Sequence, residues 1–151
     1  MYKMITIILF LALFFKCAAP GYSELVILKS QYESNQLTWS NIDFCLSAYN
    51  IKEPDMVKKQ IYHETGNLKS RLCKEQNNLF GMRLARLRQT TAIGEGNHMA
   101  KYRSWQESIE DYGIWQDKYY SGGDYYKFLS DHGYATDIWY TWKLKKIKAV
   151  L

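Results

Sequence analysis

A helix whose two ends are both marked in the sequence, residues 54–66, constrains the fold more than any other segment. Pro54 stands in the first turn, where its missing N–H breaks no intrahelical hydrogen bond, and Asp55 suits the positive end of the helix dipole. Gly66 accepts the left-handed backbone that ends many helices. Such a helix has to bury one face against other elements, so we expect the chain to pack around it.

The face that this helix buries ends in an acid. Val57, Ile61 and Glu64 follow one another at i, i+4 and i+7, which places them on one stripe. Burial disfavours a carboxylate and so does the negative end of the dipole, so both effects raise the pKa of Glu64. General-acid cleavage of a glycoside needs such a proton donor. From periodicity alone, a glutamate that reaches water at the helix end fits the pattern as well.

The other patterns predict a mainly α domain with a small β-hairpin. Short β-capable runs at 90–92 and 99–102 flank residues 94–97, which predicts a hairpin with a mobile tip. Residues 68–80 are expected to form a loop or short turns, and 81–88 an irregular basic passage. A further helix is expected over 39–49 after the cap Thr38, and a short helix or ordered lead-in at 22–36. Ser104 and Glu107 have the capping-box spacing and start a helix that breaks at Gly122 and Gly123, and Asp124 caps a helix through Leu129. Asp137 caps a last helix, whose buried stripe is Tyr140, Leu144, Ile147 and Leu151.

The N-terminal stretch is typical of a secretory signal. Lys3 precedes an apolar run over residues 4–15, which is short for a bilayer span but typical of a signal-peptide core. We expect residues 1–21 to be the signal and 22–151 to be one domain, with cleavage after Ala19, cleavage after Gly21 and a lipid on Cys17 all open. The expected protein is a monomer exported to the periplasm, the cell envelope or the medium. Its membrane contact would come only from an uncleaved signal or the Cys17 lipid.

The charge and the cysteines of the chain limit the kinds of partner, metal and cofactor that we expect it to bind. The formal net charge of +5 favours an anionic partner, and a bacterial cell wall, a membrane surface and a nucleic acid all qualify. Basic clusters occur at Arg83, Arg86 and Arg88 and at Lys143, Lys145, Lys146 and Lys148. No nucleic-acid motif accompanies them, so no nucleic acid is expected. Cys45 and Cys73 form either a disulfide or two buried thiols. No Cys/His spacing suggests zinc, and neither a metal nor another cofactor is expected.

Short motifs occur in a fixed order along residues 50–147. They are His-Glu-Thr-Gly at 63–66, Ser70, Asn-Asn-Leu-Phe-Gly-Met at 77–82, Tyr-Arg-Ser-Trp at 102–105 with Glu107, Ser108, Asp111 and Tyr112, and Gly-Tyr-Ala-Thr-Asp at 133–137 with Lys143 and Leu144. Together they resemble the bacterial glucosaminidase family of autolysins and of flagellar and phage wall hydrolases. The resemblance spans most of the chain after the signal.

The resemblance implies a lysozyme-like, mainly helical fold with a small β-hairpin lobe. It implies a groove for peptidoglycan glycan strands and an endo-β-N-acetylglucosaminidase activity, which cleaves the β-1,4 bond after N-acetylglucosamine. Glu64 is the implied catalytic acid. The candidate substrate-binding residues are Asn77, Asn78, Phe80, Gly81, Tyr102 and the aromatic Tyr134.

The sequence leaves open which group attacks the anomeric carbon or activates water. Glu95 is the acidic residue of the hairpin and a candidate base, which would place the carboxyl groups roughly 6.5–9.5 Å apart and invert the product. Alternatively, the acetamido oxygen of the substrate acts as the nucleophile. A muramidase or a lytic transglycosylase on the same fold is the alternative enzyme, and a non-catalytic peptidoglycan-binding or assembly protein is the alternative of another class.

Overall fold

The computed structural model describes residues 35–134 and 137–148. Residues from Leu37 onward belong to one compact unit, and the other unit, Met1–Gln36, is described only at Asn35 and Gln36. The expected signal at 1–21 and the lead-in up to residue 34 therefore lie outside the described residues. Within the part that is described, no helix combines the length and the apolar character that crossing a membrane requires.

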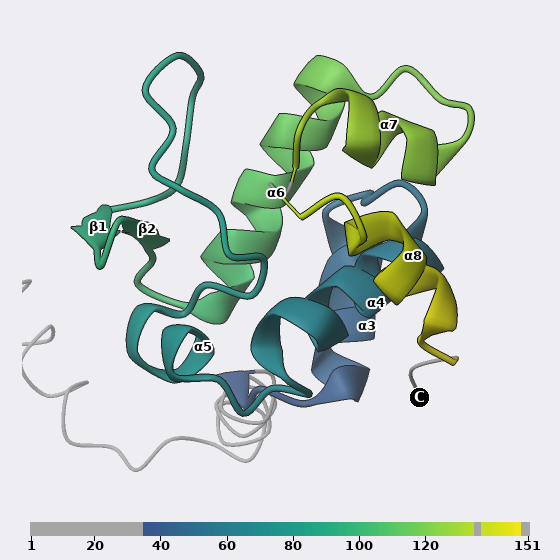
Figure 1. The fold of residues 1–151 in the computed structure, drawn as a ribbon. Coiled ribbons are helices and arrows are strands. Elements are labelled where there is room, and N and C mark those ends of the chain that lie inside the picture. The colour runs from purple at the N-terminus through teal and green to yellow at the C-terminus, as the bar shows by residue number, and fades with distance from the viewer. Residues whose placement is uncertain (1–34, 135–136, 149–151) are drawn as a thin grey trace, which may run out of the picture. The chain divides into compact units, whose positions relative to one another are not determined.

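The described part of the larger unit is mainly helical, as predicted, with six helices and one two-stranded antiparallel sheet (Figure 1). The elements are α3 Trp39–Ala48, α4 Pro54–Thr65, α5 Arg71–Gln76, β1 Gly94–Gly96, β2 Met99–Lys101, α6 Trp105–Tyr119, α7 Tyr125–Asp131 and α8 Tyr140–Lys146.

Helix α4 lies at the centre of the fold and has the bounds that the sequence predicts. It contacts α3, α5 and α8, and its Val57 and Ile61 have no exposed surface. Gly66 ends it with φ +55°, and the N–H of Asn67 donates to the Tyr62 carbonyl at 3.0 Å. This left-handed ending closes the last turn directly after Glu64 and Thr65.

The predicted side-chain caps are confirmed at the N-termini of three helices. Thr38 Oγ1 accepts from the N–H of Asn41 at the start of α3, and Asp124 Oδ1 accepts two backbone N–H bonds at the start of α7. Ser104 accepts from the N–H of Glu107, but the Glu107 carboxylate reaches back to the N–H of Arg103 rather than to that of Ser104. Local hydrogen bonds therefore set these boundaries.

The last helix, α8, begins later than predicted. Asp137 was expected to cap it, but the N-cap is Trp139, and the Asp137 carboxylate accepts from the Trp139 N–H at 2.9 Å before the helix begins. Tyr140 and Leu144 are buried and Ile147 packs against the core, as the predicted stripe requires. Leu151, the last member of that stripe, lies outside the described residues.

The segment predicted as a loop or short turns contains the short helix α5. Ser70 accepts from the N–H of Cys73 at 3.2 Å, and Asn77 ends the helix with φ +54°. Cys73 is buried beneath this turn, and neither it nor Cys45 forms a disulfide. The two cysteines are therefore buried thiols, the second of the two alternatives.

The hairpin has a different register from the one predicted. Its strands are β1 and β2, and its tip is Asn97 and His98, both with left-handed φ, as a two-residue turn that follows the strand twist requires. Glu95 therefore lies in a strand opposite Ala100, and the prediction of a tip over 94–97 is wrong. The predicted strand at 90–92 is absent. The backbone N–H of Ala92 bonds to Thr90 Oγ1 instead of a neighbouring strand, and the Thr91 hydroxyl donates to the Glu107 carbonyl.

Candidate active site

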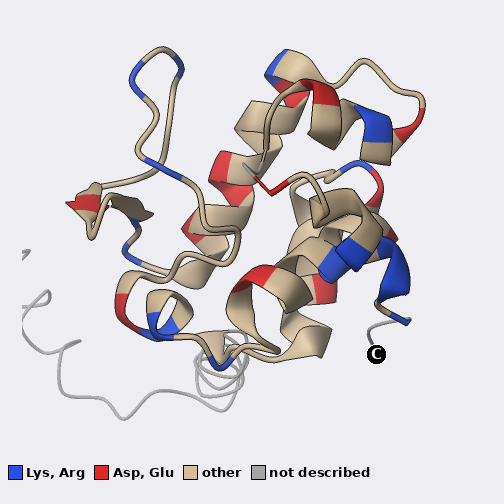
Figure 2. Cartoon of the chain, viewed as in Figure 1, with Lys and Arg blue, Asp and Glu red and all other residues tan. Residues whose placement is uncertain are grey.

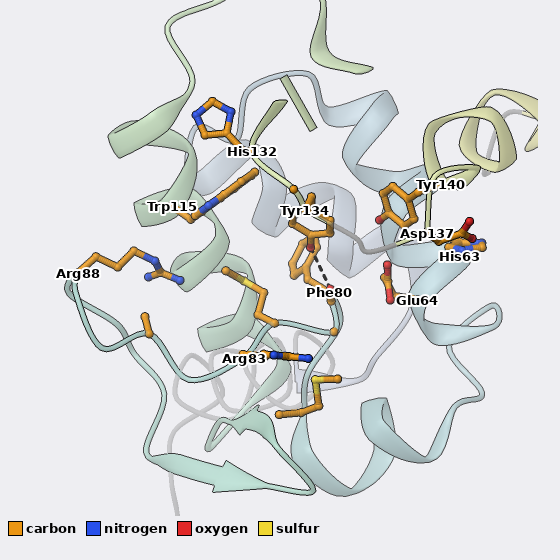
Figure 3. Close-up of a pocket in the computed structure, with 15 residues that line it drawn as sticks. His63, Glu64, Phe80, Arg83, Arg88, Trp115, His132, Tyr134, Asp137 and Tyr140 are labelled. Atoms are coloured by element: carbon orange, nitrogen blue, oxygen red, sulfur yellow. Dashed lines mark hydrogen bonds between the residues drawn. The ribbon is translucent and has the colours of Figure 1, made fainter. Parts of the chain in front are cut away.

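A pocket of about 660 Å³ opens beside the C-terminal end of α4 (Figure 3). Its walls come from α4, the loop after α5, β2, α6, the chain between α7 and α8, and the start of α8, so segments far apart in the sequence meet there. The lining residues are His63, Glu64, Phe80, Gly81, Met82, Arg83, Ala85, Arg88, Met99, Trp115, His132, Gly133, Tyr134, Asp137 and Tyr140.

Glu64 is half-buried and lies in the last turn of α4, where its carboxyl group faces the pocket. Burial raises its pKa, and a hydrogen bond from the Tyr140 hydroxyl partly opposes this rise. The net direction is upward, as predicted from the helix stripe. Thr65 holds the turn in place, since its hydroxyl donates to the Ile61 carbonyl at 2.6 Å and accepts from the N–H of Leu68 at 2.8 Å.

Gly81 lies against the carboxyl group of Glu64. Its φ is +63°, and a Cβ atom on it would lie 2.8 Å from Glu64 Oε2. A side chain at this position would occupy the space of the carboxyl group, so the loop can approach the acid so closely only with glycine. The two predicted site residues are thus brought into direct contact.

Phe80 and Tyr134 are also brought to the pocket. The Phe80 ring is almost fully buried and stacks on Tyr112 with a centroid distance of 4.1 Å. The Tyr134 hydroxyl donates to the Phe80 carbonyl at 2.9 Å, which ties the chain after α7 to the loop after α5 (Figure 3). Tyr134 stays half-buried and faces the pocket, whereas the Phe80 ring faces the core.

Asn77 and Asn78 do not line the pocket but hold the loop that does. The buried Asn78 amide donates to the carbonyls of Met82 and Ala100, each at 2.9 Å, and its oxygen accepts from the N–H groups of Phe80 and Met82. The Asn77 amide donates to two backbone carbonyls just before α6. These contacts fix the path of residues 78–82 beside Glu64.

Tyr102 and Glu95 also lie outside the pocket lining. The Tyr102 ring is buried, and its hydroxyl donates to Asp111 Oδ2 at 2.8 Å. The side chain of Glu95 is 44% exposed, and its carboxylate lies 3.5 Å from the Arg86 guanidinium. The structure therefore does not bring Glu95 into the same pocket as Glu64.

A buried ion pair supports the pocket wall. Arg88 donates to both carboxylate oxygens of Asp111, at 2.6 and 3.0 Å, and both side chains are nearly or fully buried. Burial alone would raise the pKa of Asp111, but hydrogen bonds from Arg88, Thr90 and Tyr102 outweigh it and lower the pKa. Sequence reasoning assigned Arg88 only to a basic cluster, since nothing local reveals its partner on α6.

Asp137 is the second carboxyl group that lines the pocket. It is held by Lys143 at 2.5 Å and by the N–H of Trp139, and these bonds lower its pKa. Glu64 has no ion pair with any residue that the structure describes. The pKa of Asp137 is therefore lowered and that of Glu64 is raised. Two carboxyl groups with pKa values shifted in opposite directions are typical of a site for acid catalysis.

The two basic clusters seen in the sequence lie apart, one on the loop after α5 and one on α8 (Figure 2). Of the loop cluster, Arg83 and Arg88 line the pocket. Among the described residues, no group of three or more His, Cys, Asp or Glu side chains has the arrangement of a metal site.

Comparison with known proteins gives one match. The model of the glucosaminidase family, described as mannosyl-glycoprotein endo-beta-N-acetylglucosaminidase, matches residues 41–150. This range contains Glu64 and every residue that lines the pocket. No curated protein and no solved structure matches the chain.

Proposed function

The chain belongs to the glucosaminidase family, which makes it a glycoside hydrolase with a peptidoglycan-type substrate, and from this we propose that it cleaves the β-1,4 bond after N-acetylglucosamine. In this proposal it is an endo-β-N-acetylglucosaminidase with Glu64 as the general acid. The observation that carries the proposal is the position of Glu64, in a pocket, half-buried, with a raised pKa and without an ion pair.

The proposed chemistry starts with proton transfer. The protonated Glu64 carboxyl group donates its proton to the glycosidic oxygen as the bond to the anomeric carbon breaks, so the leaving sugar departs as an alcohol. Gly81 leaves room for the carboxyl group against the loop, and Tyr134 offers a half-buried ring in the pocket lining for a sugar face. Asn77 and Asn78 support binding by fixing this loop.

For the other half of the reaction, we propose that the acetamido oxygen of the substrate attacks the anomeric carbon. Two features favour this over a second protein carboxylate. Glu95 is paired with Arg86 and lies outside the pocket lining, and Asp137 is held by Lys143 and a backbone N–H. Attack by the substrate's own group and then by water retains the anomeric configuration, whereas direct attack by water that Glu95 activates would invert it.

The test is peptidoglycan digestion with Glu64→Gln and Glu95→Gln. The first variant should retain its circular dichroism and thermal unfolding midpoint but lose at least about a hundredfold in turnover, as expected on removing a general acid. The second should retain most of the turnover. Mass spectrometry should find reducing-end N-acetylglucosamine, and proton NMR of the first product should find retention.

Several outcomes would contradict these assignments. Full turnover by Glu64→Gln would refute the role of the acid. Products with muramic acid at the reducing end would instead indicate a muramidase, and products with anhydro-muramic acid a lytic transglycosylase. A protein that pellets with sacculi but releases no fragment would be a binding protein. Inversion together with loss of activity in Glu95→Gln would restore Glu95 as the base.

We further propose that residues 1–21 export the protein to its substrate. The apolar run over residues 4–15 after Lys3 supports this proposal. The mass of the protein recovered from the cell envelope or the medium tests it, because signal cleavage and lipidation of Cys17 give different masses.

A further inference from the structure

Behind Glu64, buried polar side chains from α4, α6, α7 and α8 form a continuous chain of hydrogen bonds. At most 5% of the surface of any member is exposed, although each carries a hydroxyl or an amide. The members are Gln60, Tyr112, Gln116, Tyr125 and Tyr140.

At the end of the chain far from Glu64, backbone atoms fix the orientation of the Gln116 amide. The backbone N–H of Lys52 can only donate, and it donates to Gln116 Oε1 at 2.9 Å. The Gln116 amide nitrogen donates back to the Lys52 carbonyl at 2.9 Å and also to the Tyr125 hydroxyl at 2.6 Å. The orientation of the Gln116 amide is therefore set by backbone atoms, and the Tyr125 oxygen acts as an acceptor.

The order of the remaining bonds is set by Gln60. Its Oε1 can only accept, and the Tyr112 hydroxyl donates to it at 2.5 Å, so the Tyr112 oxygen must accept the proton of the Tyr125 hydroxyl. With its oxygen engaged, Gln60 directs its amide nitrogen to the Tyr140 hydroxyl, at 3.4 Å. The proton of Tyr140 is then free to donate to Glu64.

We propose that this chain is a one-way donor relay that orients the Glu64 carboxyl group and favours its ionised form, with Gln60 as a positioning residue that acts through Tyr140. A hydrogen bond that is donated to a carboxylate stabilises the anion. Burial of Glu64 acts in the opposite direction. The relay thereby limits the cost of ionising a buried acid, which must release and regain its proton in every catalytic cycle.

Other charged and titratable groups line the pocket together with Glu64. Arg88 and Asp137 are already neutralised by Asp111 and Lys143. The remaining groups in the lining are His63 on α4, Arg83 on the loop, and His132 and Tyr134 after α7. The variants of the test leave all of them in place, so a change in the titration of Glu64 reports on the relay.

The test is a titration of the Glu64 carboxyl carbon by carbon-13 NMR without substrate, with Glu64→Gln used to assign the signal. Tyr140→Phe removes the last donor and should raise the pKa of Glu64 by about one unit. Gln60→Met has a similar volume but donates no hydrogen bond, and should raise the pKa in the same direction. Tyr62→Phe, on the exposed side of α4, is the control and should leave the pKa unchanged.

Tyr112→Phe is a second variant that tests the relay, and it can be used even if Gln60→Met does not fold. Without the Tyr112 proton, the Gln60 amide can turn its oxygen to Tyr140, which then donates to Gln60 rather than to Glu64, so the same rise is expected. An unchanged pKa in Gln60→Met or in Tyr112→Phe would show that Tyr140 acts alone. A lowered pKa would show that the relay runs the other way, and either result overturns the proposal.

The consequence for catalysis rests on the proposed function and is measured separately. In Gln60→Met, the alkaline limb of the kcat profile should move up with the pKa found by NMR, because an acid catalyst loses its proton at higher pH, and KM should stay unchanged. A shift by NMR in a protein without glycosidase activity would refute the function and keep the relay. A shifted NMR pKa with an unmoved alkaline limb would refute the catalytic role of the relay.

Discussion

The contact between Gly81 and Glu64 makes Gly81→Ala a sharp test of how the acid is positioned. The substitution adds one methyl group, whose carbon would lie 2.8 Å from Glu64 Oε2, whereas ordinary van der Waals contact begins at about 3.4 Å. The carboxyl oxygen must therefore retreat by about 0.6 Å. The new residue must also adopt the left-handed backbone, with φ +63°.

The strained backbone should lower the stability of the protein, and the displaced carboxyl group should lower its turnover. The left-handed backbone costs an alanine about 1–2 kcal/mol, which lowers the thermal unfolding midpoint by about 4–10 °C for a domain of this size. The carboxyl group sits at the end of a flexible side chain, so its retreat costs little stability. Since misplacement of a catalytic group by about 1 Å can cost about a hundredfold in rate, a retreat of this size should lower kcat about tenfold.

The assay measures kcat on purified peptidoglycan at a temperature where every variant is folded, together with thermal unfolding. Gly122→Ala is the matched control, because it also forces an alanine into positive φ but meets no atom within 4 Å. It lies between α6 and α7 and outside the pocket lining, so it should lose stability and keep its turnover. Full turnover by Gly81→Ala would refute the reasoning that this contact sets the position of the acid.

Three further predictions concern pH, the buried ion pair and the thiols. The folded-state pKa of Glu64 is raised, so its contribution to stability is complete below the ordinary pKa of glutamate and is lost as pH rises through the folded value. The thermal unfolding midpoint of the protein, relative to that of Glu64→Gln, should therefore fall over that pH range. Arg88→Met should cost about 3–5 kcal/mol in urea unfolding, because it leaves the Asp111 carboxylate buried without its partner; adding Asp111→Leu should recover part of that loss. Burial raises the pKa of Cys73 to about 11 and also raises that of Cys45, so mass spectrometry after alkylation should find both modified only in denaturant.

Sequence patterns predicted the features that depend on neighbouring residues. The bounds of α4, its left-handed ending at Gly66 and the caps Thr38 and Asp124 all rest on hydrogen bonds that span a few residues. The position of Glu64 on the buried stripe follows from the helix period, and so does the upward direction of its pKa.

Sequence patterns failed at the register of the hairpin and at the short helix α5. The hairpin was displaced because the Asn97–His98 turn, rather than the glycines at 94 and 96, fixes its register. Helix α5 was missed because only its Ser70 cap marks it and its buried face consists of Cys73 and Gln76.

The sequence by itself therefore determined that an acid continues the apolar stripe at the end of a helix, because a helix repeats its geometry and its stop signal is local. Only the tertiary structure decided what surrounds that acid. It placed Gly81 against the carboxyl group and Tyr140 at its side, and it left Glu95 outside the pocket lining. The physical reason is that these neighbours are chosen by the packing of side chains far apart in the chain, which no local pattern encodes.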